Sequence, residues 1–223
     1  MGYADDAGIA STSAEGLAKM MTVIVTVFEA AGLTVSERKT ETMPLRIPNE
    51  AIWISSLVIE AGGQRYMQTM QFLYLGGLVD ASADIMLEMK RRIQLAWACY
   101  NRFKRELYEM EDTPFTLKVR MLKAEVMETL LHGCVTWTLG QEHFADLRTA
   151  HDNLLIRIIG FQRRQLTDHL MSCAKAFKKA QYESVETTIR KRRLLFAGGV
   201  QQTTNERLTH RVIFGTLAGG ENQ

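Results

Sequence analysis

Gly2-Tyr3-Ala4-Asp5-Asp6, near the start of this 223-residue chain, places two adjacent carboxylates directly behind an aromatic residue. These residues and those that follow predict a strand, a turn and a second strand, with both acids at the tip. Carboxylates on rigid backbone can hold Mg²⁺ against a triphosphate in phosphoryl transfer. The alternative is a solvated surface turn, because a bare Tyr-x-Asp-Asp motif occurs by chance in roughly a few per cent of chains of average composition.

A helix is predicted next, from about Ala14 to Ala31. Ser13 can cap its first turn, and Gly32 is the residue type that ends helices. Apolar side chains recur within it at the spacing of one helix face, namely Leu17, Met20, Met21, Ile24, Val25 and Phe28.

Residues 33–80 favour strands and tight turns. Leu33–Val35 and Ala51–Ile59 are rich in β-branched residues, which are typical of strands. Gly62-Gly63 predicts a turn into Tyr66–Met70, and Tyr74–Gly77 predicts a second tight turn. The first section is therefore α+β.

The chain after Asp80 is predicted to be mainly α-helical. Pro114 is expected at the first position of the helix predicted at 114–131, and Gly198-Gly199 is expected to break the helix predicted between 166 and 196. The tail after residue 218 is expected to fray. The helices are expected at about residues 82–109, 114–131 and 142–159, the last ending at Gly160, with at least one more between 166 and 196.

Charge is distributed unevenly along the sequence. Residues 1–80 hold 5 Lys+Arg and 9 Asp+Glu, a net −4, whereas residues 81–223 hold 22 and 16, a net +6. A basic second half fits a polyanionic partner such as nucleic acid. Solvated helix faces are the plainer explanation of the same charges.

Three widely separated cysteines, Cys99, Cys134 and Cys173, favour buried thiols in a reducing compartment over a disulfide framework. The pairs His132-x-Cys134 and His169-x3-Cys173 have some ligand character. No Cys-x2-Cys accompanies them, however, so a structural zinc site is not expected. No signal peptide or membrane-length apolar run is visible, and the sequence predicts a soluble intracellular protein, nuclear or cytoplasmic, without a membrane partner.

Several motifs follow the acidic box in a fixed order. Gly32–Glu41 reads GLTVSERKTE and Phe72–Gly77 reads FLYLGG. With the YADD box they resemble the reverse transcriptase of non-LTR (LINE-type) retrotransposons, in which a YADD hairpin, a G-L-x-x-N-x-x-K-T segment and an F-x-Y-L-G hairpin follow one another at similar distances. Looser similarity to that family continues at Leu131–Trp137, Leu154–Gly160, Arg192–Gly198 and Asn205–Leu208.

The resemblance implies catalytic roles for three residues. Asp5 would be a direct ligand of the Mg²⁺ cofactor and Asp6 its supporting acid. Lys39 would contact the dNTP triphosphate or protonate the leaving pyrophosphate, a role that a lysine of lowered pKa can fill. A solvated lysine is the alternative for Lys39.

The resemblance also implies contacts with an RNA template and a DNA primer. Tyr3 would lie beside the primer end or the nascent base pair. Phe72, Tyr74, Leu75 and Gly76 would form the primer-grip hairpin, for which an ordinary β-turn is the alternative. The basic helix faces after residue 82, with Lys90, Arg91 and Arg92, would follow the template–primer backbone.

The expected organisation is a truncated reverse-transcriptase palm at 1–80, thumb-like helices at 81–140 and a basic helical region at 141–223. Ser36, His132 and Val135 depart from the family pattern, which usually has Asn, Tyr and Glu there. The family's fingers, endonuclease domain and first catalytic aspartate would lie upstream of Met1. The sequence therefore predicts a fragment of an RNA-directed DNA polymerase that is inactive alone.

Two other functions fit the same sequence. The basic helices could form a nucleic-acid-binding module without catalysis, which predicts affinity for RNA or DNA that falls steeply with salt. The apolar stripes of residues 82–131 could instead serve a protein-interaction scaffold, which predicts oligomerisation and no affinity for polyanions. The sequence leaves the oligomeric state open.

Overall fold

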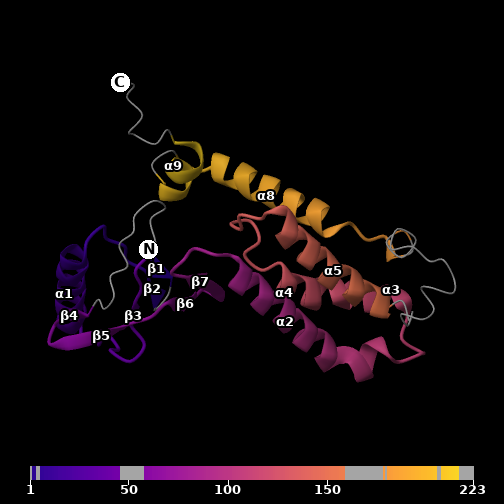
Figure 1. Cartoon of the computed structure of the whole chain (residues 1–223), viewed down its shortest axis with the longest axis horizontal. Coiled ribbons are helices and arrows are strands. Elements are labelled where there is room, and N and C mark those ends of the chain that lie inside the picture. The colour runs from indigo at the N-terminus through magenta and orange to yellow at the C-terminus, as the bar shows by residue number, and fades with distance from the viewer. Residues whose placement is uncertain are drawn as a thin grey trace. The chain divides into compact units, whose positions relative to one another are not determined.

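The computed structural model describes residues 2–3, 6–45, 58–158, 178, 180–204 and 207–215. It divides into two compact units, Met1–Asp84 and Ile85–Gln223 (Figure 1). The first combines one long helix with sheets of two or three short strands, and the described part of the second is helical. The predicted α+β class is confirmed.

Helix α1 (Ala14–Ala30) has the ends that its sequence predicts. The Ser13 hydroxyl accepts a hydrogen bond from the Gly16 N–H at 3.1 Å. At the other end Gly32 adopts φ +76°, and the Leu33 N–H reaches back to the Phe28 carbonyl at 2.8 Å. Ser13 and Gly32 therefore fix the helix to within one residue of the expected span.

A three-stranded sheet packs against α1. Strands β4 (Ile59–Ala61) and β5 (Gln64–Gln68) pair antiparallel through Gly62-Gly63, whose φ angles are +58° and +75°. Strand β3 (Glu41–Thr42) joins the other edge of β5 in parallel. The predicted glycine hairpin is confirmed. The strand expected at Leu33–Val35 is wrong: that segment follows the helix cap without pairing, and residues 51–57 lie outside the described part.

The described part of the first unit contains two further hairpins. Strands β1 (Gly2–Tyr3) and β2 (Asp6–Ala7) pair antiparallel, as do β6 (Gln71–Tyr74) and β7 (Gly77–Asp80). Leu75 and Gly76 connect β6 to β7 with φ angles of +48° and +80°. This is the turn that the sequence predicts before residues 78–79.

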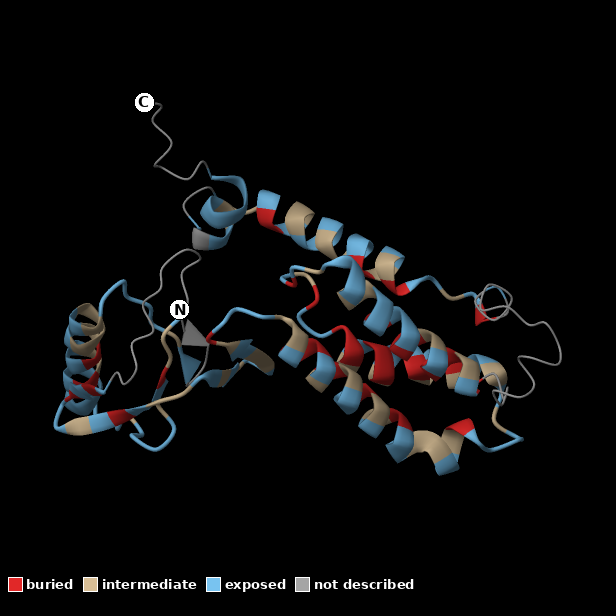
Figure 2. Cartoon of the chain, in the orientation of Figure 1, coloured by how far each residue is buried: buried red, intermediate tan, exposed pale blue. Residues whose placement is uncertain are grey.

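The core of the first unit is small. Helix α1 packs against β4, and buried positions lie on both elements (Figure 2). Gly62 lies so close to this core that a Cβ there would be 2.5 Å from Val25 Cγ1. The buried apolar residues of this cluster are Met21, Val25, Ile59, Ala61 and Tyr66.

The second unit begins with two helices that each contain a wider π-helical turn. Helix α2 (Met86–Phe103) continues as η1 (Lys104–Tyr108), and α3 (Phe115–Met121) continues through η2 (Leu122–Met127) into α4 (Glu128–Leu130). Both helices were expected, but the first starts four residues later than predicted. Pro114 is the cap that precedes α3, with ψ +134°, and is not inside its first turn.

Within the described residues three more helices follow: α5 (Gln141–Ile158), α8 (Val185–Gln201) and α9 (Leu208–Phe214). The predicted break at Gly198-Gly199 is wrong, because α8 runs through both glycines. Val200, just beyond them, is buried. Gly160 and the tail after residue 218 lie outside the described residues.

The helical unit has a continuous core. Helix α2 packs against α4, α5 and η2, and α5 packs against α8. Figure 2 shows buried positions concentrated along these helices. The largest fully buried side chains include Leu122, Leu130, Leu147, Leu154 and Ile189. No helix within the described ranges combines the length and apolar character that a membrane crossing requires.

Candidate active site

The YADD box forms a hairpin. Tyr3 on β1 pairs with Asp6 on β2, and Gly2 pairs with Ala7. Asp6 is exposed, so its carboxylate is open to solvent next to the closed end of the strand pair. Asp5 lies outside the described residues, as does the side chain of Tyr3. The described hairpin therefore supplies one carboxylate of the predicted pair.

This hairpin meets part of what Mg²⁺ requires. Mg²⁺ takes hard oxygen ligands and is usually held by one or two carboxylates together with substrate phosphates. Asp6 offers one carboxylate on paired backbone. Within the described part of the chain no group of three or more His, Cys, Asp or Glu could hold a metal ion. The residues fit a shared site completed by substrate phosphates.

Lys39 lies on an exposed turn that is attached to the sheet. The Ser36 carbonyl accepts hydrogen bonds from the N–H groups of Lys39 and Thr40 at 3.2 and 3.0 Å. The Glu37 carboxylate in the same turn accepts from the backbone N–H of Arg65 on β5 at 3.1 Å. The turn is thus fixed to β5, while the Lys39 side chain faces solvent.

The β6–β7 hairpin carries four of the predicted primer-contacting residues. The rings of Phe72 and Tyr74 stack on one face of β6, with centroids 5.9 Å apart and an interplanar angle of 17°. Leu73 points to the other face and is exposed, as is Leu75 in the turn. A leucine in the left-handed region is rare, so this turn is a strained place for an apolar side chain.

The two hairpins meet at Gly8. A Cβ built on Gly8, which directly follows β2, would lie 3.7 Å from both Cζ and the hydroxyl oxygen of Tyr74. The Tyr74 ring therefore packs against the chain two residues after Asp6. The sequence motifs gave no signal of this contact, because Gly8 lies outside both of them.

Asp80, at the end of β7, is another carboxylate of this unit, but it is engaged locally. Its Oδ1 accepts from the Ser82 N–H at 2.9 Å and from the Ser82 hydroxyl. The hydroxyl hydrogen bond holds the pKa of Asp80 below its usual value. Asp80 is thereby committed to the turn that leaves the hairpin.

The three predicted basic residues of α2 differ sharply in exposure and in ion pairing. Lys90 is exposed. Arg91 Nη1 lies 3.3 Å from one Glu88 oxygen, and Arg92 Nε lies 2.6 Å from the other. Arg92 and Glu88 are only 5% and 4% exposed. The prediction that Arg92 belongs to an open basic face is corrected: its guanidinium is part of a buried ion pair. The spacing of Glu88 and Arg92, four residues apart, was the signal for it.

Part of the basic second half is likewise used inside the helical unit. Arg192 donates to the Leu131 carbonyl and pairs with Glu128, and Arg193 donates to the Trp137 carbonyl. These arginines tie α8 to the turn after α4. Exposed basic side chains of the second half include Lys90, Arg105, Arg120, Arg190, Arg207 and Arg211.

Neither cysteine in the described part of the chain forms a disulfide. Cys134 is packed in the helical core, where burial raises the pKa of its thiol, and His132 beside it is exposed. His169 and Cys173 lie outside the described residues. The Cys134 thiol is thus a core side chain.

Comparison with known proteins gives one informative match. The chain is 23% identical over 208 residues to an uncharacterized transposon-derived protein of Caenorhabditis elegans, covering 93% of this chain and 73% of that protein. No protein-family profile matches the chain, and no solved structure matches it. The similarity supports a transposable-element origin.

Proposed function

We propose that this chain carries the end of the palm and the thumb-like helices of a non-LTR retrotransposon reverse transcriptase, the enzyme of RNA-directed DNA synthesis. The antiparallel pairing of Tyr3 with Asp6 carries the proposal, because it makes a hairpin of the YADD box. The similarity to a transposon-derived protein agrees with that origin.

Each hairpin has a separate task in this proposal. Asp6, with Asp5, offers carboxylate oxygens to Mg²⁺, which when bound neutralises phosphate charge and activates the primer hydroxyl. Lys39, on its fixed turn, offers a positive charge to the triphosphate. The β6–β7 hairpin holds the primer end through the Leu75-Gly76 turn, where the glycine lets backbone approach closely.

The metal site is tested by replacing Mg²⁺ with Fe²⁺ and adding ascorbate and peroxide, so that radicals cut the backbone around the bound ion. We expect cuts within residues 3–8 that Asp6→Asn abolishes. Asp80→Asn is the matched control, because Asp80 is a carboxylate of the same unit that is engaged by Ser82. If the Asp6→Asn variant is cut as the wild type is, the metal site is rejected.

The primer site is tested with an RNA-template/DNA-primer duplex that carries a photoreactive base at the primer 3′ end. Cross-links are expected in the peptide of residues 71–80. A duplex with the same base at the primer 5′ end is the control and is expected to mark other peptides. Mg²⁺-dependent primer extension that Asp5→Ala removes would show an active polymerase and would correct the inactivity predicted from the sequence.

A nucleic-acid-binding module without catalysis is the second candidate, favoured by the exposed basic side chains on α2, α3 and α8. It predicts an affinity for RNA or DNA that falls linearly with the logarithm of salt, with a slope of about −0.9 per neutralised phosphate on duplex. Lys90→Gln should reduce that slope by about 1. Binding that salt does not affect would remove this candidate.

A further inference from the structure

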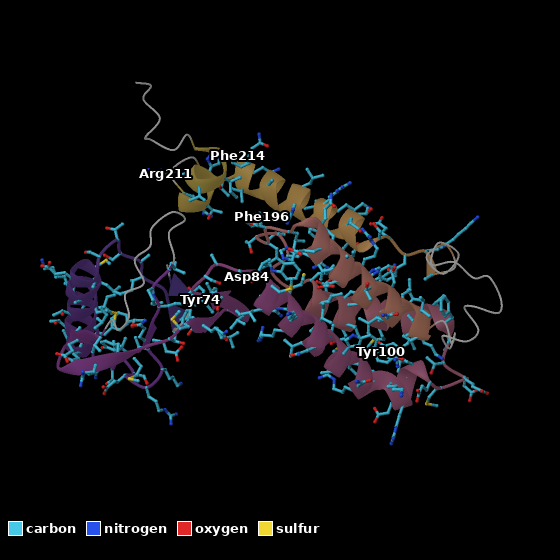
Figure 3. The ribbon with its side chains drawn as sticks, viewed as in Figure 1. Tyr74, Asp84, Tyr100, Phe196, Arg211 and Phe214 are labelled. Atoms are coloured by element: carbon cyan, nitrogen blue, oxygen red, sulfur yellow. The ribbon has the colours of Figure 1, made fainter. Side chains whose placement is uncertain are left out.

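The contact between Tyr74 and Gly8 links the two hairpins of the proposed site. Tyr74 is the last residue of β6, and Gly8 directly follows β2. A Cβ on Gly8 would be 3.7 Å from Cζ and from the hydroxyl oxygen of Tyr74 and 3.9 Å from Cε2, so the ring edge faces the Gly8 backbone. Tyr74 is labelled in Figure 3.

Tyr74 is held from two other directions. Its ring stacks on Phe72 with centroids 5.9 Å apart, and its backbone pairs with Gly77 in the β6–β7 ladder. A ring supported in this way has few positions available to it. Because the ring is fixed on the β6–β7 hairpin, it can in turn fix the part of the chain against which it packs.

Asp6 is close in sequence to that part of the chain. Only Ala7 separates it from Gly8, and Asp6 and Ala7 form β2. A two-residue strand pair has little stability of its own. Packing at Gly8 therefore matters for where the Asp6 carboxylate is held.

We infer that Tyr74 is a positioning residue: its ring, packed against the backbone at Gly8, sets the position of the Asp6 hairpin relative to the β6–β7 hairpin. The functional consequence rests on the proposed function: Tyr74 would set the distance between a metal at Asp6 and a primer end at the β6–β7 turn. Tyr74 acts through Gly8 and need not touch the reacting atoms.

The contact is tested by NMR on the full chain with glycine and aspartate isotope labels. Protons of Gly8 beside an aromatic ring should show a ring-current shift, and Gly8→Ala identifies that signal by removing it. Tyr74→Leu should eliminate the shift and move the Asp6 amide signal, whereas Tyr74→Phe should preserve both. Leu73→Ala, on the opposite face of β6, is the matched control and should leave both unchanged.

The consequence is tested by adding Mn²⁺, which broadens nearby signals, to the same samples. In the wild type, broadening around Asp6 should occur and should be lost in Asp6→Asn. Tyr74→Leu should raise the Mn²⁺ concentration required by about tenfold, and Tyr74→Phe should not.

The outcomes separate the inference from the proposed function. Absence of a Gly8 ring-current shift overturns the inference, whatever the metal does. A ring-current shift with Mn²⁺ broadening that Tyr74→Leu leaves unchanged also overturns it, while the metal site stands. If Asp6→Asn does not remove the broadening, the metal site is overturned. The inference is then decided by whether Tyr74→Leu moves the Asp6 amide signal.

Discussion

The helical unit (Ile85–Gln223) and the unit Met1–Asp84, here called the hairpin unit, bury different numbers of apolar side chains. In the described residues, the core of the helical unit includes nineteen buried residues from α2 to α8, whereas that of the hairpin unit has five. The hairpin unit leaves Met67, Leu73 and Leu75 exposed. Since buried apolar area is the main source of stability, Asp6, Lys39 and the β6–β7 hairpin lie on the weaker part of the described molecule, whereas Lys90 lies on the stronger part.

The largest expected effect concerns two ion pairs with the same spacing, one in each unit. Glu88→Gln removes the carboxylate partner of the buried Arg92 and should lower the free energy of unfolding by about 3–5 kcal/mol. Glu15→Gln breaks the exposed Glu15–Lys19 pair and should leave the urea midpoint unchanged. Far-UV circular dichroism in urea measures both.

The double variant Glu88→Leu/Arg92→Leu completes that experiment. Replacing both charges by apolar groups should recover most of the loss, because no buried charge is then left without its partner. A double variant as unstable as Glu88→Gln would contradict the view that the lost pairing is the cause.

The second effect tests how tightly the small core of the hairpin unit is built. Gly62 and Gly63 both have positive φ, but only Gly62 would place a Cβ against Val25. Gly63→Ala should cost about 1 kcal/mol from backbone strain, and Gly62→Ala about 2–3 kcal/mol from strain plus overpacking. Hydrogen exchange of the α1 and β4–β5 peptides measures the difference. Equal costs for the two substitutions would show that the Val25 side chain can move aside without loss of stability.

A smaller effect of opposite sign is expected in the helical unit. Gly198 and Gly199 lie inside α8, and a Cβ on either would meet no atom within 4 Å. Gly198→Ala and Gly199→Ala should each raise the free energy of unfolding by about 0.5–1 kcal/mol, since alanine loses less backbone entropy. Thermal unfolding is the measurement. A loss of stability would contradict the open space beside both glycines.

The smallest effect is a dependence on pH at the start of α8. Burial raises the pKa of Glu186, but its backbone N–H and hydrogen bonds from Arg148 and Ser184 favour the carboxylate more, so the pKa lies below the ordinary value of 4.5. The carboxylate therefore stabilises the fold above pH 4.5, and this contribution is lost as the pH falls through the lowered pKa. Glu186→Gln should cost about 0.5 kcal/mol at neutral pH and nothing in strong acid, by urea unfolding at several pH values.

Local chemistry made the ends of elements predictable from the sequence. Ser13 and Gly32 act within a few residues of themselves, and so does the Gly62-Gly63 turn. The break predicted at Gly198-Gly199 was wrong because local residue type alone does not decide whether a helix continues. The cost of a helical glycine is only about 1 kcal/mol, and Val200 directly after the two glycines is buried.

Some features of the candidate site were predictable from the sequence and others were not. The sequence predicted both hairpins, because each is closed by neighbouring residues. It did not predict that Tyr74 meets Gly8 or that Arg92 is buried, since periodicity places a side chain on a helix face without saying which neighbour covers that face.

The π-helical turns η1 and η2 bear on how this chain is compared with its relatives. In η1 the Glu109 N–H bonds to the carbonyl of Lys104, five residues earlier, so the turn holds one residue more than an α-helical turn. A relative with uninterrupted α-helices there would keep the same packed faces with one residue fewer. Alignments of such a relative should open a single-residue gap within 104–108 or 122–127, a placement that residue similarity alone would leave undetermined.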